Sequence, residues 1–139
     1  MSDIFYLGID YGTKKTGVAI AQRVTSKARP LKIIYQNYIN QINEIILEWD
    51  IDTIIIGYPL NNGKEKKIHK DIKNFVQDLK RSIDSKIKII LYNEHYTSDL
   101  ARNDYAQMRI DGLIKKKSDY DDISASIILQ SWINENTMD

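Results

Sequence analysis

The chain has 139 residues, enough for one domain of ordinary size and too few for two substantial ones. Apolar residues make up 42% and charged residues 28%, as in soluble globular proteins, and the absence of cysteine excludes disulfides, thiol nucleophiles and Cys-type zinc sites. The net charge is +1, but the charged residues are unevenly distributed along the chain, because no acidic residue lies between Asp10 and Glu44. That stretch holds six basic residues: Lys14, Lys15, Arg23, Lys27, Arg29 and Lys32.

The first third of the chain predicts three strands. Residues 4–11 read as an apolar strand, residues 12–15 as a tight turn, and residues 16–22 as the antiparallel partner. Residues 31–38 read as a third strand after a basic loop that contains proline.

The hydrophobic period then changes to that of a helix. Apolar residues at i, i+3, i+4 and i+7 from Ile42 to Trp49 predict a helix that Asn40 caps. Residues 53–57 are wholly apolar, which is typical of a buried parallel strand. A long amphipathic helix is expected from Ile68 to Ile83, followed by a strand over residues 86–92.

Two helices are expected at the end of the chain. One runs from Thr97 to about Ile110, and the last starts at Ser118 or Asp119 and ends near Asn134. The resulting order, βββαβαβαα, predicts an α/β fold with a five-stranded mixed sheet and helices on both faces. We expect residues 1–139 to form a single domain, with its ligand crevice at the carboxyl ends of the parallel strands.

Three carboxylates are expected to meet at that edge of the sheet. Asp10 lies near the end of the first strand, Glu94 just after the fifth, and Asp121 at the start of the last helix. Small residues at positions 124 and 125 would let this helix approach the sheet closely. An all-oxygen site of this kind suits Mg²⁺ or Mn²⁺, which could activate water and hold a phosphodiester in line.

Each acid also has a simpler interpretation. Asp10 could form a turn, Glu94 could be an ordinary loop acid, and Asp121 could stabilise a helix N-terminus. Asp122 is an equal candidate to Asp121 on physical grounds alone. His69 stands among lysines in a charged helix and is expected to be exposed, whereas the two tryptophans, Trp49 and Trp132, are expected to be buried or half-buried.

Four separated motifs resemble the YqgF/RuvX family of RNase H-like proteins, described as pre-16S rRNA nucleases and Holliday junction resolvases. They are LGIDYGTKKTGVAIA (7–21), IIIGYPLNNG (54–63), NEHYTS (93–98) and YDDISASIILQSWI (120–133). The resemblance implies an RNase H-like nuclease whose catalytic metal ligands are Asp10, Glu94 and Asp121. In place of the family's arginine, this chain has His95, whose charge would depend on pH near neutrality.

The resemblance implies a nucleic-acid partner. The candidate phosphate contacts are Thr13, Lys14 and Lys15 in the first turn, together with His95 and the run Lys115, Lys116 and Lys117. A lysine run can equally be a solvated surface. An rRNA precursor, trimmed at its 5′ side, is the expected substrate of a cytoplasmic protein with no membrane partner, acting as a monomer or homodimer.

Three other functions stay open. A four-way DNA junction would normally require two active sites in a symmetric dimer. The DYGTKKTG hairpin also resembles the phosphate-binding hairpin of actin/hexokinase-type phosphotransferases, but those enzymes clamp ATP between two domains and 139 residues supply one. A nucleic-acid-binding module without catalysis would be indifferent to divalent metal.

Overall fold

The computed structural model describes residues 4–59, 63–93 and 120–136 of the chain, and in the last range the side chains from residue 123 onward. The elements follow the predicted order: β1 (Phe5–Asp10), β2 (Thr16–Gln22), β3 (Ala28–Ile34), α1 (Tyr38–Trp49), β4 (Ile51–Tyr58), α2 (Lys67–Ser82), β5 (Lys88–Asn93) and α4 (Tyr120–Asn136). The helix expected over residues 97–110 lies outside the described residues.

The five strands form one mixed sheet in the order β3-β2-β1-β4-β5. β2 is antiparallel to both β1 and β3, whereas β1, β4 and β5 are mutually parallel. This confirms the predicted five-stranded α/β sheet. The carboxyl ends of β1, β4 and β5 therefore open on the same edge of the sheet.

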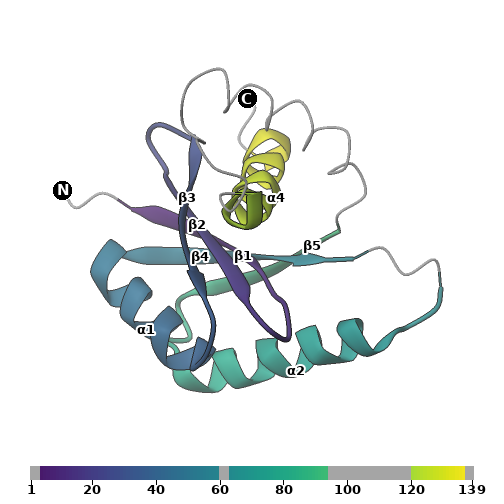
Figure 1. Cartoon of the computed structure of the whole chain (residues 1–139). Helices are drawn as coiled ribbons and strands as arrows, with labels where there is room; N and C mark the ends of the chain where they lie inside the picture. Colours follow the sequence, from purple (N-terminus) through teal and green to yellow (C-terminus); the bar gives the residue numbers. More distant parts are fainter. Residues whose placement is uncertain (1–3, 60–62, 94–119, 137–139) are drawn as a thin grey trace.

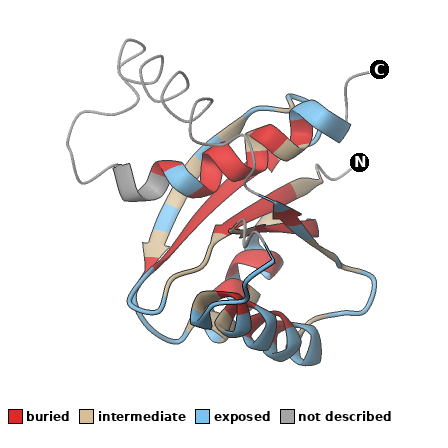
Figure 2. Ribbon diagram, turned by 90° about the vertical axis from the view of Figure 1, so that its right-hand side faces the viewer, coloured by how far each residue is buried: buried red, intermediate tan, exposed pale blue. Residues whose placement is uncertain are grey.

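Helices cover both faces of the sheet (Figure 1), α4 on one face and α1 with α2 on the other. Consecutive residues of β4 show why both faces are buried: Ile54 and Ile56 pack into the α1/α2 core, whereas Ile55 packs under α4. All three side chains are fully buried. The buried residues accordingly line both sides of the sheet (Figure 2), as expected for a wholly apolar parallel strand.

The helix α4 lies unusually close to β1. A Cβ atom added at Gly8 would lie 2.7 Å from the Cβ of Leu129 and 2.9 Å from the carbonyl oxygen of Ala125. Only a glycine at this position of the strand permits this separation. The close approach expected from the small residues of the last helix is thus confirmed at Ala125, which is fully buried.

The third strand and the first helix begin earlier than expected. β3 starts at Ala28 and contains Pro30, which is tolerated because β3 is an edge strand of the sheet. α1 begins at Tyr38, not after Asn40, because Asn37 adopts a left-handed conformation with φ 53° that turns the chain into the helix. Asn37 is at the N-cap position but makes no side-chain cap hydrogen bond.

The expectation that His69 is exposed is wrong. Its side chain is only 1% exposed, on the buried face of α2 that also carries Ile72, Val76 and Leu79. The exposed lysines around it occupy the other side of the helix. Trp49 and Trp132 are half-buried, as expected.

Candidate active site at the carboxyl end of β1

Asp10 is the last residue of β1 and faces the side of the sheet covered by α4. Side chains alternate along a strand, so Asp10 shares its face with Gly8, where α4 makes its close approach. The half-buried Asp10 lines a cavity of about 320 Å³. The turn between β1 and β2 forms one wall of this cavity, and Ser124 of α4 lies on the other.

The turn between β1 and β2 is held in place from two directions. The Oγ1 of Thr16, which is fully buried, accepts a hydrogen bond from the Gly12 N–H at 3.3 Å and donates one to the Gly12 carbonyl at 3.4 Å. The Tyr38 hydroxyl, at the start of α1, donates to the same carbonyl at 2.8 Å. A Cβ at position 12 would lie 2.4 Å from the Lys15 carbonyl oxygen, so this path of the chain requires glycine.

The same turn presents basic and polar side chains beside the carboxylate. Thr13, Lys14 and Lys15 are exposed, and all three line the cavity with Asp10. An acid that could hold a cation therefore lies next to ammonium groups that attract phosphate, which is the combination that cleavage of a phosphodiester needs.

The backbone of α4 brings the third predicted acid toward this cavity. Position 121 is in the first turn of α4, one helical turn before Ala125 and three residues before Ser124. Since Ser124 lines the cavity, the start of α4 lies at the same edge of the sheet as Asp10. The side chains of Asp121 and Asp122 lie outside the described residues.

The remaining predicted site residues follow β5 in the chain. β5 ends at Asn93, which pairs with Tyr58 at the end of β4. Glu94 and His95 come next and, like Lys115, Lys116 and Lys117, lie outside the described residues. Within residues 4–59, 63–93 and 123–136, no group of three or more His, Asp or Glu side chains is close enough to hold a metal ion.

Thr16 and Tyr38 support the site through their hydrogen bonds with Gly12, and neither was singled out from the sequence. The spacing of Gly12 and Thr16 across a tight turn could have indicated the Thr16 hydrogen bonds. No sequence signal marks Tyr38, which is 26 residues from Gly12.

Tyr11 follows Asp10 and belongs to an aromatic cluster on the opposite face of the sheet. Its ring centroid lies 4.9 Å from that of Phe75 and 5.9 Å from that of Tyr38. Burial raises the pKa of the Tyr11 phenol, and the nearby carboxylate of Asp71 raises it further. Tyr11 is therefore a hydrogen-bond donor at neutral pH.

A model of the RuvX family, described as Holliday junction resolvase, matches residues 5–135. The chain belongs to the RuvX family. Among curated RuvX relatives, one from Sulfurihydrogenibium sp. is 35% identical over 92% of this chain and 88% of its own length. Another, from Mycoplasma mobile, is 37% identical over 92% of this chain and 90% of its own length. Both carry the name "Putative pre-16S rRNA nuclease".

Solved structures confirm the RNase H-like fold of this RuvX protein. RuvC of Thermus thermophilus, solved in complex with a Holliday junction substrate, superposes with a TM-score of 0.67 at 11% identity, over 96% of each chain. The Holliday junction resolvase of fowlpox virus, solved with junction DNA, gives a TM-score of 0.59 at 15% identity, over 94% of this chain and 97% of its own. Family membership makes the chain a phosphodiester-hydrolysing enzyme, as predicted.

No helix within the described residues combines the length and apolar character needed to cross a membrane.

Proposed function

We propose that this protein is a divalent-metal-dependent nuclease that trims the 5′ side of the 16S rRNA precursor in the cytoplasm. The observation that carries the proposal is the cavity in which Asp10, the basic turn and the start of α4 meet. The curated relatives named as pre-16S rRNA nucleases match nearly the whole chain, which favours this substrate.

The chemistry of the described donors fits a hard divalent cation. Asp10 offers a half-buried carboxylate, and the cavity of about 320 Å³ leaves room for an ion that keeps part of its water shell. The family resemblance adds Glu94 and Asp121 as the other ligands, all of them oxygen donors. Bound Mg²⁺ or Mn²⁺ would supply an activated water and charge stabilisation at the phosphate.

The chain's own residues bind and orient the substrate. Lys14 and Lys15 are proposed to contact the backbone phosphates on either side of the bond that is cut, and Thr13 to donate a hydrogen bond to one of them. The hydrogen bonds of Thr16 and Tyr38 with Gly12 hold this turn, so the backbone that carries Lys14 and Lys15 stays beside Asp10 in the absence of substrate. His95 and the run from Lys115 to Lys117 are proposed to extend the phosphate-binding surface.

Cleavage of four-way DNA junctions is the second candidate function. The description of the matching family model and the fold shared with two junction resolvases favour it. Symmetric cleavage of a junction requires two active sites in a dimer, whereas trimming of a precursor requires one. The oligomeric state of the active species therefore separates the two candidates.

One cleavage experiment tests the proposal. The protein is offered a 16S rRNA precursor that retains its 5′ leader, a four-way DNA junction, and single-stranded RNA and DNA, each with Mg²⁺, Mn²⁺ or EDTA. We expect cleavage of the precursor within its leader with either metal and none with EDTA. Preferential cleavage of the junction would transfer the assignment to the second candidate.

A charge-neutral variant shows whether the cut belongs to this site. Asp10→Asn removes the ligand charge and keeps the shape of the side chain, so we expect cleavage to fall by at least about 1,000-fold with unchanged stability. Glu44→Gln is the matched control, because Glu44 is an exposed carboxylate on α1 away from the cavity. Cleavage by Asp10→Asn at the wild-type rate would overturn the assignment.

A further inference from the structure

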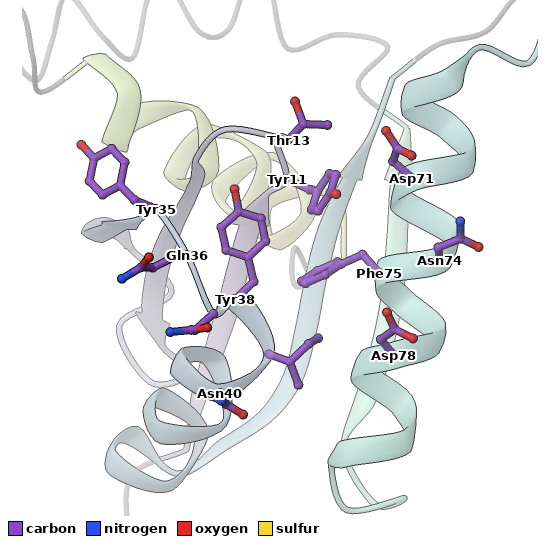
Figure 3. Close-up of a pocket in the computed structure, with 12 residues that line it drawn as sticks. Tyr11, Thr13, Tyr35, Gln36, Tyr38, Asn40, Asp71, Asn74, Phe75 and Asp78 are labelled. Atoms are coloured by element: carbon purple, nitrogen blue, oxygen red, sulfur yellow. The ribbon is translucent and has the colours of Figure 1, made fainter.

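A second cavity, of about 570 Å³, adjoins the one at Asp10. It lies between the turn that joins β3 to α1 and one face of α2 (Figure 3). Tyr11 and Thr13 line both cavities, so the second begins where the first ends. We call it the tyrosine cavity and define it by Tyr11, Tyr35, Tyr38, Asp71, Phe75 and Asp78.

Aromatic rings form the inner wall of the tyrosine cavity. The rings of Tyr11 and Phe75 are tilted by 34° relative to each other, and Tyr38 stands nearly perpendicular to both. Tyr35 stands at the rim, where Figure 3 shows its ring on the opposite side of the cavity from α2. Tyr35 is 67% exposed, so its ring is accessible to a ligand.

The polar groups of the cavity do not suit a phosphate. Within the described part of the chain, its lining contains two carboxylates and several side-chain amides but no lysine or arginine. Asp71 and Asp78 lie two turns apart on α2, and each is close to one cation of its own helix, Lys67 at 3.5 Å and Arg81 at 3.3 Å. Because a carboxylate has about four acceptor positions, both retain capacity for a ligand that donates N–H groups.

We propose that the tyrosine cavity binds an unpaired base of the strand that is cut, and that it selects guanine. A planar, uncharged ligand with N–H donors matches both the aromatic wall and the carboxylates. Guanine presents two adjacent N–H donors on its Watson–Crick edge, which match the two oxygens of one carboxylate, whereas uracil presents one donor between two carbonyl groups that a carboxylate repels. The inference rests on the proposed function, because it needs a nucleic-acid strand at Asp10.

The geometry limits where the base lies in the strand. Asp10 and Tyr11 are neighbours whose side chains point to opposite faces of the sheet, and their Cα atoms are about 3.8 Å apart. Because Tyr11 and Thr13 line both cavities, a base in the tyrosine cavity belongs to a nucleotide near the one whose phosphate lies at Asp10.

The first test uses mononucleotides and needs no cleavage. Guanosine 5′-monophosphate and uridine 5′-monophosphate are titrated into the full-length protein, and NMR follows the ring signals of Tyr11, Tyr38 and Phe75. We expect guanosine monophosphate to shift these signals and to bind at least about fivefold more tightly than uridine monophosphate. Equal affinities, or no shift of these rings, would overturn the proposal.

The second test uses variants and short RNA. With Ca²⁺ in place of Mg²⁺, the affinity for a labelled hexamer containing one guanosine is measured. Tyr35→Ala should weaken binding about tenfold, the loss expected for one stacked base, and Tyr35→Trp should restore it. The double variant Asp71→Asn/Asp78→Asn, which removes both carboxylates of the cavity, should equalise the affinities for hexamers with and without guanosine.

Leu47→Ala is the control for the loss of an exposed apolar side chain, because Leu47 is 86% exposed and lines neither cavity. A loss of affinity in Leu47→Ala equal to that in Tyr35→Ala would overturn the proposal. The outcomes also distinguish a failure of the proposed nuclease function from a failure of the proposed base site. Guanosine binding without cleavage of any substrate would refute the proposed function alone, whereas precursor cleavage without guanosine preference would refute the base site alone.

Discussion

His69 joins the end of β4 to the start of α2 through the carbonyl group of Pro59. Its Nδ1 accepts a hydrogen bond from the backbone N–H of Lys66 at 2.9 Å, and its Nε2 lies 2.9 Å from the Pro59 oxygen. An accepting Nδ1 carries no proton, so the imidazole is neutral and Nε2 is the donor to Pro59. The ring also packs against Tyr58, with centroids 5.0 Å apart.

Replacing His69 should destabilise the protein. His69→Ala removes both hydrogen bonds of a fully buried side chain and leaves a cavity, so we expect a loss of about 2–4 kcal/mol in the free energy of unfolding. His69→Gln can still reach back to the Lys66 N–H, as glutamine does at this position of a capping box, and should lose less. Urea denaturation measures both, and a loss below about 0.5 kcal/mol in His69→Ala would contradict the prediction.

Adding one methyl group at Gly8 should separate α4 from the sheet. Gly8→Ala places a Cβ at 2.7 Å from that of Leu129, so the helix must shift, at a cost of about 1–3 kcal/mol. Because α4 also carries Ser124 and position 121, we expect cleavage to fall further than stability alone explains. The loss of stability and the direct loss of activity can be separated by measuring cleavage at a temperature where the variant is fully folded. Full activity there would show that the active site does not depend on this contact.

The two lysines of the first turn should set the salt dependence of nucleic-acid binding. Replacing Lys14 and Lys15 with alanine should reduce the slope of log affinity against log salt by up to about two phosphate contacts. The double replacement of Lys80 and Lys88 is the matched control, since both are exposed and neither lines a cavity beside Asp10. An equal change of slope in both double variants would indicate that general surface charge accounts for binding.

The ionisation of Tyr11 should respond to Asp71 and not to Asp78. A negative charge disfavours a phenolate, so Asp71→Asn should lower the pKa of Tyr11. The pKa should stay above the usual tyrosine value, because burial, the largest cause of the rise, is unchanged. NMR titration with labelled tyrosine follows this shift, and Asp78→Asn serves as the control. A Tyr11 pKa that is the same in Asp71→Asn as in the wild type would contradict the prediction.

The regular elements of the fold could be predicted because their patterns are local. The apolar runs of β1, β2 and β4 are typical of strands that are buried on both faces of a sheet. The start of α1 was expected later in the chain, because Asn37 and Asn40 both suit an N-cap and the local pattern does not decide between them. The burial of His69 could have been predicted, since it lies three residues before Ile72 and seven before Val76 on one helical face.

The sequence indicated those parts of the candidate site that lie at the end of a strand or near the start of a helix. Asp10 follows from its position at the end of a strand, and the small residue Ala125 indicated where α4 would approach. The hydrogen bond from Tyr38 to Gly12 joins groups from separate elements, and no local pattern predicts it. The tyrosine cavity likewise depends on the packing of α2 against the turn before α1.

The outer edge of β3 is poorly suited to pair with a strand from another molecule. Pro30 has no N–H group to donate, and the N–H of Ala28 already donates to the Oε1 of Gln130 from α4 at 2.8 Å. An incoming strand would therefore lack two of the donors that it needs for a continuous ladder. This arrangement protects the edge from aggregation, and it disfavours a homodimer in which the β3 strands of two molecules pair.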